Sequence, residues 1–363
     1  MHGYLIQCFR PRFSGNELEN LGKCLDSGIL ASGPMVKEFE AKWKAISVKK
    51  FNVGFNSGSS AAAAIFAFLK EKYGPCEVYA PSLSFSSPVW AAKQCGHEIG
   101  FVDVSTKNFC TSRQFIDKAM APHASSSRKR VVFPLLYGGI SSIDVQEPSE
   151  ETIIVVDSCH TVNPRIESDY IFFSFHPVKP VAMANGGLVS TDDEAAAEYF
   201  LRFRNFGRSF TDVSYDVVQP GFNSYMNDLN AAIGLAQLDH YEQNIERRKK
   251  IAKLYDETID QEKYDIVQHI DPEGRSSYYL YTIVAKELKR VDRLVHYLRS
   301  EGIETLIHYP LIHKLTYFRT EGQPVLENSE RVEGRFLNIP CHASMTPEDA
   351  KFVAEAVNSY SEN

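Results

Sequence analysis

The sequence predicts an α/β protein in two parts: a large domain on a mainly parallel β-sheet, followed by a smaller α+β domain. Three observations support this prediction. The chain has 363 residues, more than one hydrophobic core usually serves. Helical and strand-like runs alternate between about residues 15 and 205. Beyond about residue 226 the alternation gives way to a long, increasingly charged helical stretch, followed by a few mixed segments.

In the first part, the helices have apolar residues at helical spacing, and the strands are short runs rich in β-branched and aromatic residues. The expected helices cover residues 16–27, 35–45, 59–70, 88–94 and 113–120. The expected strands cover residues 51–55, 77–80, 98–102, 130–135, 152–156 and 170–175. Such alternation implies parallel strand pairing, with helices on both faces of the sheet.

The second part starts within a long helical stretch at about residues 226–259. Its charged run at 246–250 is expected to be a solvated helix face. The later candidates are strands at 277–284 and 304–307 and helices at 292–300 and 347–358. We place the domain boundary after residue 240, which gives a large domain of residues 1–240 with an N-terminal helical segment and a small domain of residues 241–363.

Composition excludes several function classes. The net charge is -7 and no long Lys/Arg block is present, so a nucleic-acid partner is not expected. The longest apolar stretch, residues 61–68, is too short for a membrane span, and the N-terminus has no apolar core of a signal peptide. The seven cysteines are scattered and form no CxxC pair, so we expect reduced thiols, no metal site and a cytoplasmic location.

A possible phosphate site follows the strand expected at residues 51–55. The segment Asn56–Ser60 reads NSGSS and begins an alanine-rich helix, where free backbone N–H groups and the helix dipole can hold an anion. Gly58 permits close approach of a ligand, and the serine hydroxyls can donate hydrogen bonds. Neither GxxxxGK[ST] nor GxGxxG occurs in the chain. An ordinary helix N-cap is the alternative reading, and this segment alone favours it.

Two further polar positions follow buried strands. Asp157 ends the apolar run TIIVVD, at the edge of the sheet where parallel sheets bind ligands, and His160 lies three residues later. Ser174 and Lys179 follow the run DYIFF. A lysine there suggests a phosphate contact or a Schiff-base amine, because a lysine between apolar strands is otherwise costly. Alternatively, Asp157 caps a turn and His160 is a core histidine.

Taken together, these features match the three contacts that pyridoxal 5'-phosphate requires. A phosphate site, a buried carboxylate for the pyridine nitrogen and a lysine that bonds to the cofactor would all lie at one edge of the sheet. Phe85, in the segment PSLSF after another strand, is available to stack on the cofactor ring. Core packing is the alternative for Phe85, and by itself that reading is favoured.

At this point the sequence resembles the DegT/DnrJ/StrS family of pyridoxal-phosphate sugar aminotransferases, which have the fold of aspartate aminotransferase (fold type I). The matching segments, in chain order, are SGILASGPMVKEFEAKW, NSGSSAAAA, APSLSFSS, FVDV, VVDSCH, SFHPVKP, PGFNSYMNDLNAAIGLAQL and IETLIHYPLIH. They run nearly end to end. The resemblance implies a mainly parallel seven-stranded sheet in the large domain and a smaller α+β C-terminal domain.

The resemblance also implies roles for individual residues. Lys179 would bond to the cofactor and then move the proton, Asp157 would pair with the pyridinium nitrogen, and His160 would lie near the phenolic oxygen. The expected cofactor-binding residues are Gly58, Ser59, Phe85, Asp157, His160, Ser174, Lys179 and Asn223. Asn223 would reach the cofactor of a neighbouring subunit, since the family builds its sites across a homodimer interface. His308 and Tyr309 would line the substrate side.

The implied reaction is a transamination in two halves. An amino acid, expected to be L-glutamate, gives up its amino group, and a keto-sugar attached to a nucleoside diphosphate accepts it. Products of this kind serve amino-sugar, surface-polysaccharide or natural-product biosynthesis. The chain departs from the family pattern at Leu135, Asn185 and Tyr225, where His, Glu and a basic residue are usual. These departures affect the expected substrate more than the expected chemistry.

Other functions remain as alternatives. Members of the same family that deoxygenate sugars are expected to lack the lysine, so Lys179 argues against a sugar dehydratase. A non-catalytic, cofactor-binding regulator is disfavoured because no DNA-binding segment is appended. A nicotinamide oxidoreductase would need the glycine fingerprint that is missing here.

Overall fold

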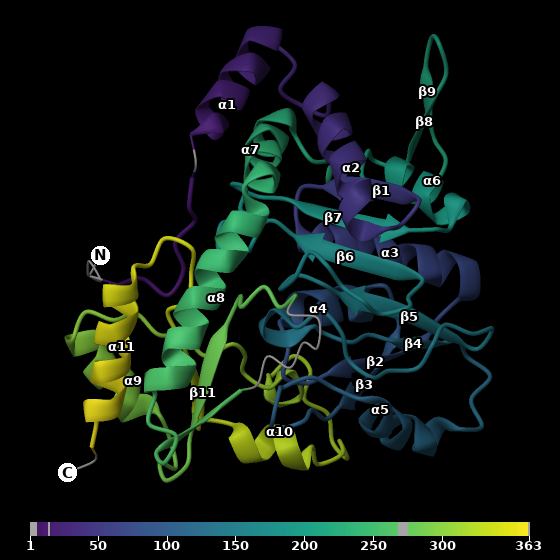
Figure 1. Cartoon of the computed structure of the whole chain (residues 1–363). Helices are drawn as coiled ribbons and strands as arrows, with labels where there is room; N and C mark the ends of the chain where they lie inside the picture. Colours follow the sequence, from purple (N-terminus) through teal and green to yellow (C-terminus); the bar gives the residue numbers. More distant parts are fainter. Residues whose placement is uncertain (1–5, 14, 268–274, 362–363) are drawn as a thin grey trace.

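Figure 1 shows the computed structural model of the chain, which describes residues 6–13, 15–267 and 275–361. The chain forms a larger sheet of seven strands, from residues 51–191, and a smaller sheet of three strands, from residues 264–339. Helices cover both faces of the larger sheet. The expected α/β class and the mainly parallel seven-stranded sheet are confirmed.

The larger sheet has the strand order β1-β7-β6-β5-β4-β2-β3. Its strands are β1 (Phe51–Phe55), β2 (Glu77–Pro81), β3 (Glu98–Val102), β4 (Arg130–Val132), β5 (Thr152–Asp157), β6 (Tyr170–Ser174) and β7 (Gly187–Thr191). Only β7 runs against its neighbours β1 and β6, and the remaining pairs in the sheet are parallel. The carboxyl ends of β1, β5 and β6 therefore meet at one edge, where β7 begins.

The helices form two layers because the strands are apolar on both sides. Along β5, Ile153 and Val155 pack into one core cluster, whereas Ile154 and Val156 pack into the other. One cluster is covered by α3 (Gly58–Tyr73), α4 (Ser86–Gln94) and α6 (Glu194–Phe203). The other is covered by α2 (Pro34–Ser47), α5 (Arg113–Met120) and α7 (Asp228–Asp239), with α1 (Asn16–Ser27) packed on α7.

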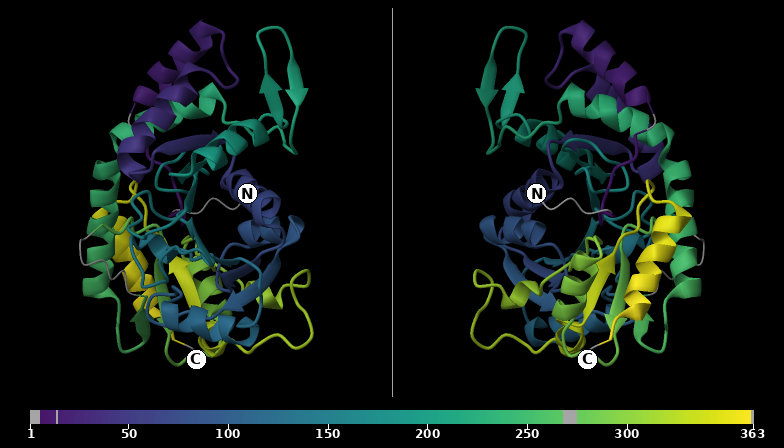
Figure 2. Two further views of the ribbon diagram at one scale, coloured as in Figure 1. Left: turned by 90° about the vertical axis from the view of Figure 1, so that its right-hand side faces the viewer. Right: turned by 90° about the vertical axis from the view of Figure 1, so that its left-hand side faces the viewer.

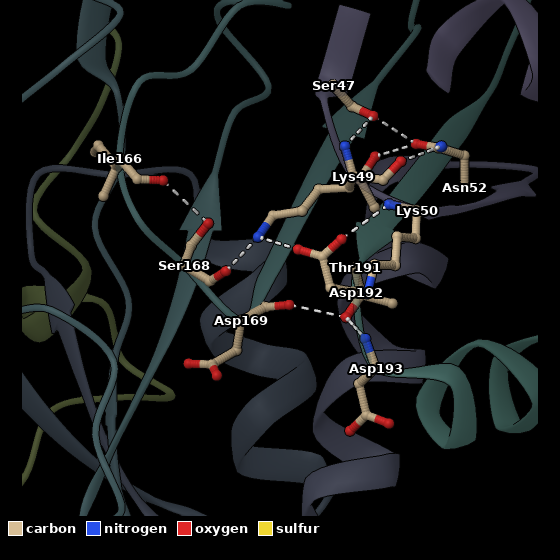
Figure 3. A network of polar contacts seen from close by, with 11 residues as sticks. Ser47, Lys49, Lys50, Asn52, Ile166, Ser168, Asp169, Thr191, Asp192 and Asp193 are labelled. Atoms are coloured by element: carbon tan, nitrogen blue, oxygen red, sulfur yellow. Dashed lines mark hydrogen bonds and ion pairs between the residues drawn. The ribbon is translucent and has the colours of Figure 1, made fainter. Parts of the chain in front are cut away.

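A polar network holds the antiparallel β7 at the amino edge of the sheet (Figure 3). The Lys49 Nζ donates to the Asp192 carboxylate at 2.9 Å and to the Ser168 carbonyl at 2.7 Å. Asp192 also accepts from the Lys50 N–H, and the Thr191 hydroxyl donates to the Asp169 carbonyl. These contacts join the end of β7 to the starts of β1 and β6. They therefore also fix how the three strands are aligned at the carboxyl ends of β1 and β6.

The three-stranded sheet is antiparallel in the order β10-β11-β12. Its strands are β10 (Tyr264–Ile266), β11 (Tyr281–Ala285) and β12 (Phe336–Ile339). The helices α8 (Tyr241–Thr258), α9 (Asp292–Ser300) and α11 (Pro347–Ser359) share a core cluster with it, and α10 (Glu327–Val332) follows the loop after α9. This part is α+β, as expected. The division of the chain at residue 240 stays a prediction.

The structure corrects three sequence predictions. The helical stretch expected at 226–259 is two helices, α7 and α8, which meet at His240. Residues 304–307 form no strand and make only an isolated bridge between Leu306 and Asn338. The strand expected from residue 277 starts at Tyr281, because Tyr278 has a left-handed backbone (φ 46°) that interrupts extended structure. The strands β7, β10 and β12, the helices α6 and α10, and the two short strands β8 (Arg208–Phe210) and β9 (Tyr215–Val217) were not predicted.

A two-stranded hairpin stands away from the rest of the molecule (Figure 2). Its strands are β8 (Arg208–Phe210) and β9 (Tyr215–Val217), and both are mostly exposed. No helix in the described residues is both long and apolar enough to cross a bilayer.

Candidate active site

The polar residues predicted from the sequence line one cavity of about 420 Å³ at the carboxyl edge of the larger sheet. The predicted residues that line it are Gly58, Ser59, Phe85, Asp157, His160, Ser174, Lys179, His308 and Tyr309. Asn223 does not line the cavity. The residues come from segments up to 250 positions apart in sequence, and the fold brings them together.

The first turn of α3 forms one end of the cavity. Ser57 caps this helix, because its hydroxyl accepts from the Ser60 N–H at 3.1 Å. Gly58 and Ser59 line the cavity in the first turn, where N–H groups lack intrahelical partners. A Cβ at Gly58 would lie 2.9 Å from the Ser174 Cβ, so only glycine fits between helix and strand. The expected N-cap and the expected anion site are therefore the same structure.

Asp157 is buried at the end of β5, with 2% of its surface exposed. Its carboxylate accepts the Cys159 N–H at 3.0 Å. Burial raises the pKa of the Asp157 carboxyl, while the Cys159 hydrogen bonds and the positive charge of Lys179 oppose that rise. Burial and these opposing contacts act on the same carboxyl, which is therefore suited to pair with a cationic group that enters the cavity.

His160 is oriented by contacts at both ring nitrogens. Its Nδ1 accepts the Gly138 N–H at 3.2 Å, so Nε2 carries the proton of the neutral ring and donates to the Tyr309 hydroxyl at 2.8 Å. Burial, together with nearby Lys179 and His308, holds the pKa of His160 well below its ordinary value. The hydroxyl of Tyr309, which accepts from His160, keeps its own proton available for another acceptor.

Lys179 follows β6 and extends into the cavity. Its Nζ donates to the Tyr279 hydroxyl at 3.2 Å and lies 4.3 Å from the centroid of the same ring. Its backbone N–H bonds to the His176 carbonyl, in a tight turn after Ser174. The amine and the Asp157 carboxyl thus approach the same space from two adjacent strands.

The opposite side of the cavity is built from residues late in the chain. The His308 N–H bonds to the Asn338 side chain at 2.8 Å, and the His308 carbonyl accepts from the Tyr137 hydroxyl at 2.7 Å. Burial, with the charge of Lys179, lowers the pKa of His308 to about 4, so its ring is neutral near pH 7. Phe85 packs against Tyr309 with ring centroids 5.8 Å apart, yet it is 52% exposed.

The three positions that depart from the family pattern do not all lie in the cavity. Leu135 and Asn185 line the cavity, but Tyr225 does not. Tyr225 instead makes an isolated backbone bridge with Phe55, at the end of β1. Asn223 is exposed nearby, where its carbonyl accepts from the Asn56 side chain at 3.4 Å.

Several cavity residues were missed by the sequence analysis, among them two aromatic residues that contact each other. Tyr279 lies in a run of aromatic residues just before β11, and Phe9 comes from the N-terminal segment. Their rings stack with centroids 5.3 Å apart. The aromatic run SSYYLY gave a strand signal but no catalytic motif, and nothing around Phe9 distinguished it from ordinary packing.

Comparison with known proteins agrees with this geometry. A model of the DegT/DnrJ/EryC1/StrS aminotransferase family matches residues 11–358. The chain belongs to this family. It is accordingly a pyridoxal phosphate-dependent aminotransferase, as the resemblance of its motifs implied.

Characterised relatives of the family cover nearly the whole chain. A UDP-4-amino-4,6-dideoxy-N-acetyl-beta-L-altrosamine transaminase of Campylobacter jejuni is 27% identical over 95% of this chain and 94% of its own length. A GDP-perosamine synthase of Escherichia coli O157:H7 is 25% identical over 98% of both. The structure of Spr1654 from Streptococcus pneumoniae superposes with a TM-score of 0.88 at 23% identity, covering 98% of this chain and 97% of that one. That likeness shows the fold.

The cavity fits pyridoxal phosphate. Gly58 and Ser59 line the cavity at the first turn of α3, where backbone N–H groups without intrahelical partners can hold a phosphate. The buried Asp157 carboxyl supplies an acid for a ring nitrogen, and the Lys179 amine lies within the same cavity. The volume of about 420 Å³ suits a ligand of small-molecule size.

Proposed function

We propose that this aminotransferase moves the amino group of an amino acid, L-glutamate, to a keto-sugar carried by a nucleoside diphosphate. The names of the two relatives support the acceptor class, because one is a UDP-sugar transaminase and the other makes GDP-perosamine. The product would enter amino-sugar, surface-polysaccharide or natural-product biosynthesis. All seven cysteines are free thiols, which agrees with a reaction in the cytoplasm.

One observation carries this proposal: a single cavity holds a helix N-terminus, a buried carboxyl and a lysine amine. Bound pyridoxal phosphate supplies a ring that accepts electrons from the reacting carbon. The residues of the chain then have separate tasks. Gly58, Ser59 and Ser174 hold the phosphate at the first turn of α3, and Phe85 covers the ring.

The buried groups of the cavity would bind and transfer protons. Asp157 would keep a ring nitrogen protonated, since a carboxylate beside it favours the charged form. Lys179 would hold the cofactor through its amine, and its Nζ would accept and return a proton. His160 would be the group nearest the cofactor's phenolic oxygen, and its hydrogen bond to Tyr309 orients that hydroxyl.

The late-chain residues face the substrates. His308 and Tyr309 are polar yet uncharged near pH 7, because burial lowers the pKa of the histidine and raises that of the tyrosine. Uncharged donors and acceptors suit the hydroxyl groups of a sugar better than the phosphates of its nucleotide. The diphosphate would therefore be bound outside this part of the cavity.

We also propose a homodimer with shared sites. The β8–β9 hairpin exposes apolar side chains, of which Val213 is 95% and Phe210 61% exposed. A lone two-stranded hairpin is marginally stable, so a second copy of the chain is the expected support. Exposed Asn223 lies close to the Asn56 side chain at the mouth of the phosphate site, where it could reach the partner's cofactor.

The reaction is tested by a panel of amino donors and nucleotide keto-sugars. L-Glutamate should change the absorbance of the bound cofactor, and mass spectrometry should then find an aminated sugar. A different donor that converts the cofactor would replace glutamate only. A deoxygenated sugar without added nitrogen would indicate the dehydratase instead, and no reaction with any nucleotide keto-sugar would refute the proposed acceptor class.

Shared sites are tested by mixing two inactive variants. Lys179→Ala and Asn223→Ala subunits, unfolded and refolded together, would form mixed dimers with one intact site each. About a quarter of the wild-type activity should return, because half of the dimers are mixed and half of their sites are intact. If the mixture stays as inactive as its components while sedimentation shows dimers, Asn223 does not act across the interface.

A further inference from the structure

The phenol of Tyr279 contacts the amine of Lys179, although the two residues belong to different sheets. Tyr279 lies two residues before β11 of the three-stranded sheet, whereas Lys179 follows β6 of the larger one. The Lys179 Nζ lies 3.2 Å from the Tyr279 hydroxyl oxygen. Tyr279 is 1% exposed, so this contact is made in a site that excludes most water. A buried hydroxyl beside the reactive amine is poised to affect it.

The backbone around Tyr279 is fixed by contacts with the short turn at Tyr137–Gly139, which lies between β4 and β5 of the larger sheet. The Ser277 N–H bonds to the Gly139 carbonyl at 2.9 Å, and the Leu280 N–H bonds to the Gly138 carbonyl at 3.3 Å. Tyr278 between them has a φ of 46°, an uncommon value for a residue with a side chain. Such a conformation costs about 1 kcal/mol or more and persists only where the surroundings impose it. It turns the chain so that Tyr279 enters the cavity.

The ring of Tyr279 is held by two neighbouring rings. Phe9 stacks on it with centroids 5.3 Å apart and planes inclined by 17°. His160 lies 4.4 Å away, and its own orientation is set by the Gly138 N–H. Since the ring cannot swing freely between these neighbours, the hydroxyl marks a fixed point for the lysine amine.

The chemistry of a phenol suits an amine that changes its charge. Burial raises the pKa of Tyr279, so the phenol is neutral near pH 7 even though Lys179 pulls that pKa down. A neutral phenol accepts a hydrogen bond from an ammonium and donates one to a neutral amine. A carboxylate only accepts, and it would favour the charged amine, which has no lone pair to react.

We propose that Tyr279 is a positioning residue, whose hydroxyl holds the Lys179 amine in reacting position in both of its protonation states. This inference rests on the proposed role of Lys179. It concerns the steps in which the lysine is a free amine and accepts or returns a proton. The tyrosine contributes no proton of its own to the overall balance.

The first test compares two buried tyrosines of the same segment. Tyr279→Phe removes the hydroxyl beside Lys179, and Tyr281→Phe removes one that bonds to the Asp256 carboxylate, away from the cavity. We expect kcat to fall roughly 10- to 100-fold in Tyr279→Phe, with each KM changed less than about threefold, because the amine is misplaced but binding is retained. Tyr281→Phe should keep its kcat.

The second test does not depend on turnover. Lys179 in the full-length, cofactor-free chain is labelled with trinitrobenzenesulfonate over a pH series, and the labelled peptide is quantified by mass spectrometry. Loss of the hydroxyl that holds the amine should change the rate at which Lys179 is labelled, by about threefold or more, in Tyr279→Phe. Tyr281→Phe should follow the wild type.

The outcomes separate this inference from the proposed function. If Tyr279→Phe matches Tyr281→Phe in kcat and in labelling, the positioning role is wrong. If Lys179→Ala remains active, the proposed function fails before Tyr279 is considered. Should Tyr279→Phe be unstable, Phe9→Leu loosens the same ring while keeping the hydroxyl, and it should show a smaller change in the same direction; no change in either measurement would overturn the role.

Discussion

Two groups of residues line the cavity, and they are built differently. In the sheet-edge group, Asp157 ends β5, Ser174 ends β6 and Lys179 lies in the turn after β6, beside the first turn of α3. The C-terminal group, Tyr279, Leu306, His308 and Tyr309, lies outside the strands. Core packing sets the first group, whereas hydrogen bonds and ring contacts set the second. The first should therefore decide which chemistry occurs. In the second, Tyr279 contacts the reacting amine, and the other residues should decide which substrate is accepted.

The largest effect is expected at Lys179. Lys179→Ala should lower kcat roughly 1,000-fold or more, because the sheet-edge group loses its nucleophile and proton carrier. Steady-state kinetics with a saturating amino donor measures it. Lys179→Arg keeps the positive charge but not the reactive amine, and it should be equally inactive. An active arginine variant would mean that the charge alone is needed.

Asp157→Asn should lower kcat by roughly 100-fold. The amide keeps the shape of the side chain but cannot stabilise a positive charge on the ring nitrogen. Asp169→Asn is the control, since the Asp169 carboxylate is part-buried and accepts the Ile154 N–H, away from the cavity. Equal losses in both variants, measured alongside melting temperatures, would assign the effect to folding.

Tyr309→Phe should raise the KM of the keto-sugar about 5- to 10-fold, the cost of about one hydrogen bond. Cofactor affinity, measured by fluorescence titration, should stay unchanged, because this residue belongs to the C-terminal group. Tyr255→Phe removes another buried hydroxyl, one that bonds to the Pro340 carbonyl, and serves as control. A lower cofactor affinity in Tyr309→Phe would erase the distinction between the two groups.

The smallest expected effect is on stability as a function of pH. The pKa of His308 falls from 6.5 to about 4 in the folded chain, so the unfolded chain binds its proton first. The free energy of unfolding should therefore decrease as the pH drops from about 6.5 to about 4, by about 2 kcal/mol once partial solvent access is allowed for. His308→Asn should flatten this slope in denaturant titrations, and the exposed His296→Asn should not.

The contribution of Asp157, in the sheet-edge group, to the free energy of unfolding should change with pH in the direction opposite to that of His308. Burial raises the pKa of Asp157 above its unfolded value, so its contribution to stability is complete below that value and is lost as the pH rises through the folded pKa. Asp157→Asn should consequently gain stability relative to the wild type as the pH rises from about 4. No such gain in denaturant titrations would mean that a neighbouring cation compensates the carboxylate.

The same contrast explains what could be predicted from the sequence. Asp157 and Lys179 were found because each follows an apolar run that can only be a buried strand, and strand ends of a parallel sheet converge. His308 and Tyr309 came from the family resemblance alone. Tyr279 and Phe9 gave no signal, since their approach depends on contacts between segments that are distant in sequence.

The missed elements have a similar cause. β7 starts with Gly187 and is only five residues long, yet it inserts between β1 and β6 against the direction of the sheet. A Cβ at Gly187 would lie 2.2 Å from the Ser57 carbonyl oxygen, so glycine is required by the close packing of β7 against the start of α3. Residue propensities predict a turn at such a glycine. In the folded chain, close packing makes it the first residue of a strand.

The FVDV motif has a mechanical consequence. Its Asp103 carboxylate accepts the N–H groups of Asn328 and Ser329 and the Ser329 hydroxyl, at 2.6–2.9 Å. The Ile312 N–H also bonds to the Ser82 carbonyl. These hydrogen bonds join the segment of residues 306–329, which contains His308 and Tyr309, to the larger sheet. The backbone bridge between Leu306 and Asn338 joins the same segment to the smaller sheet. A hinge rotation that moves the C-terminal part away from the larger sheet would have to break one set of these hydrogen bonds, so we expect substrates to enter the cavity without such a rotation.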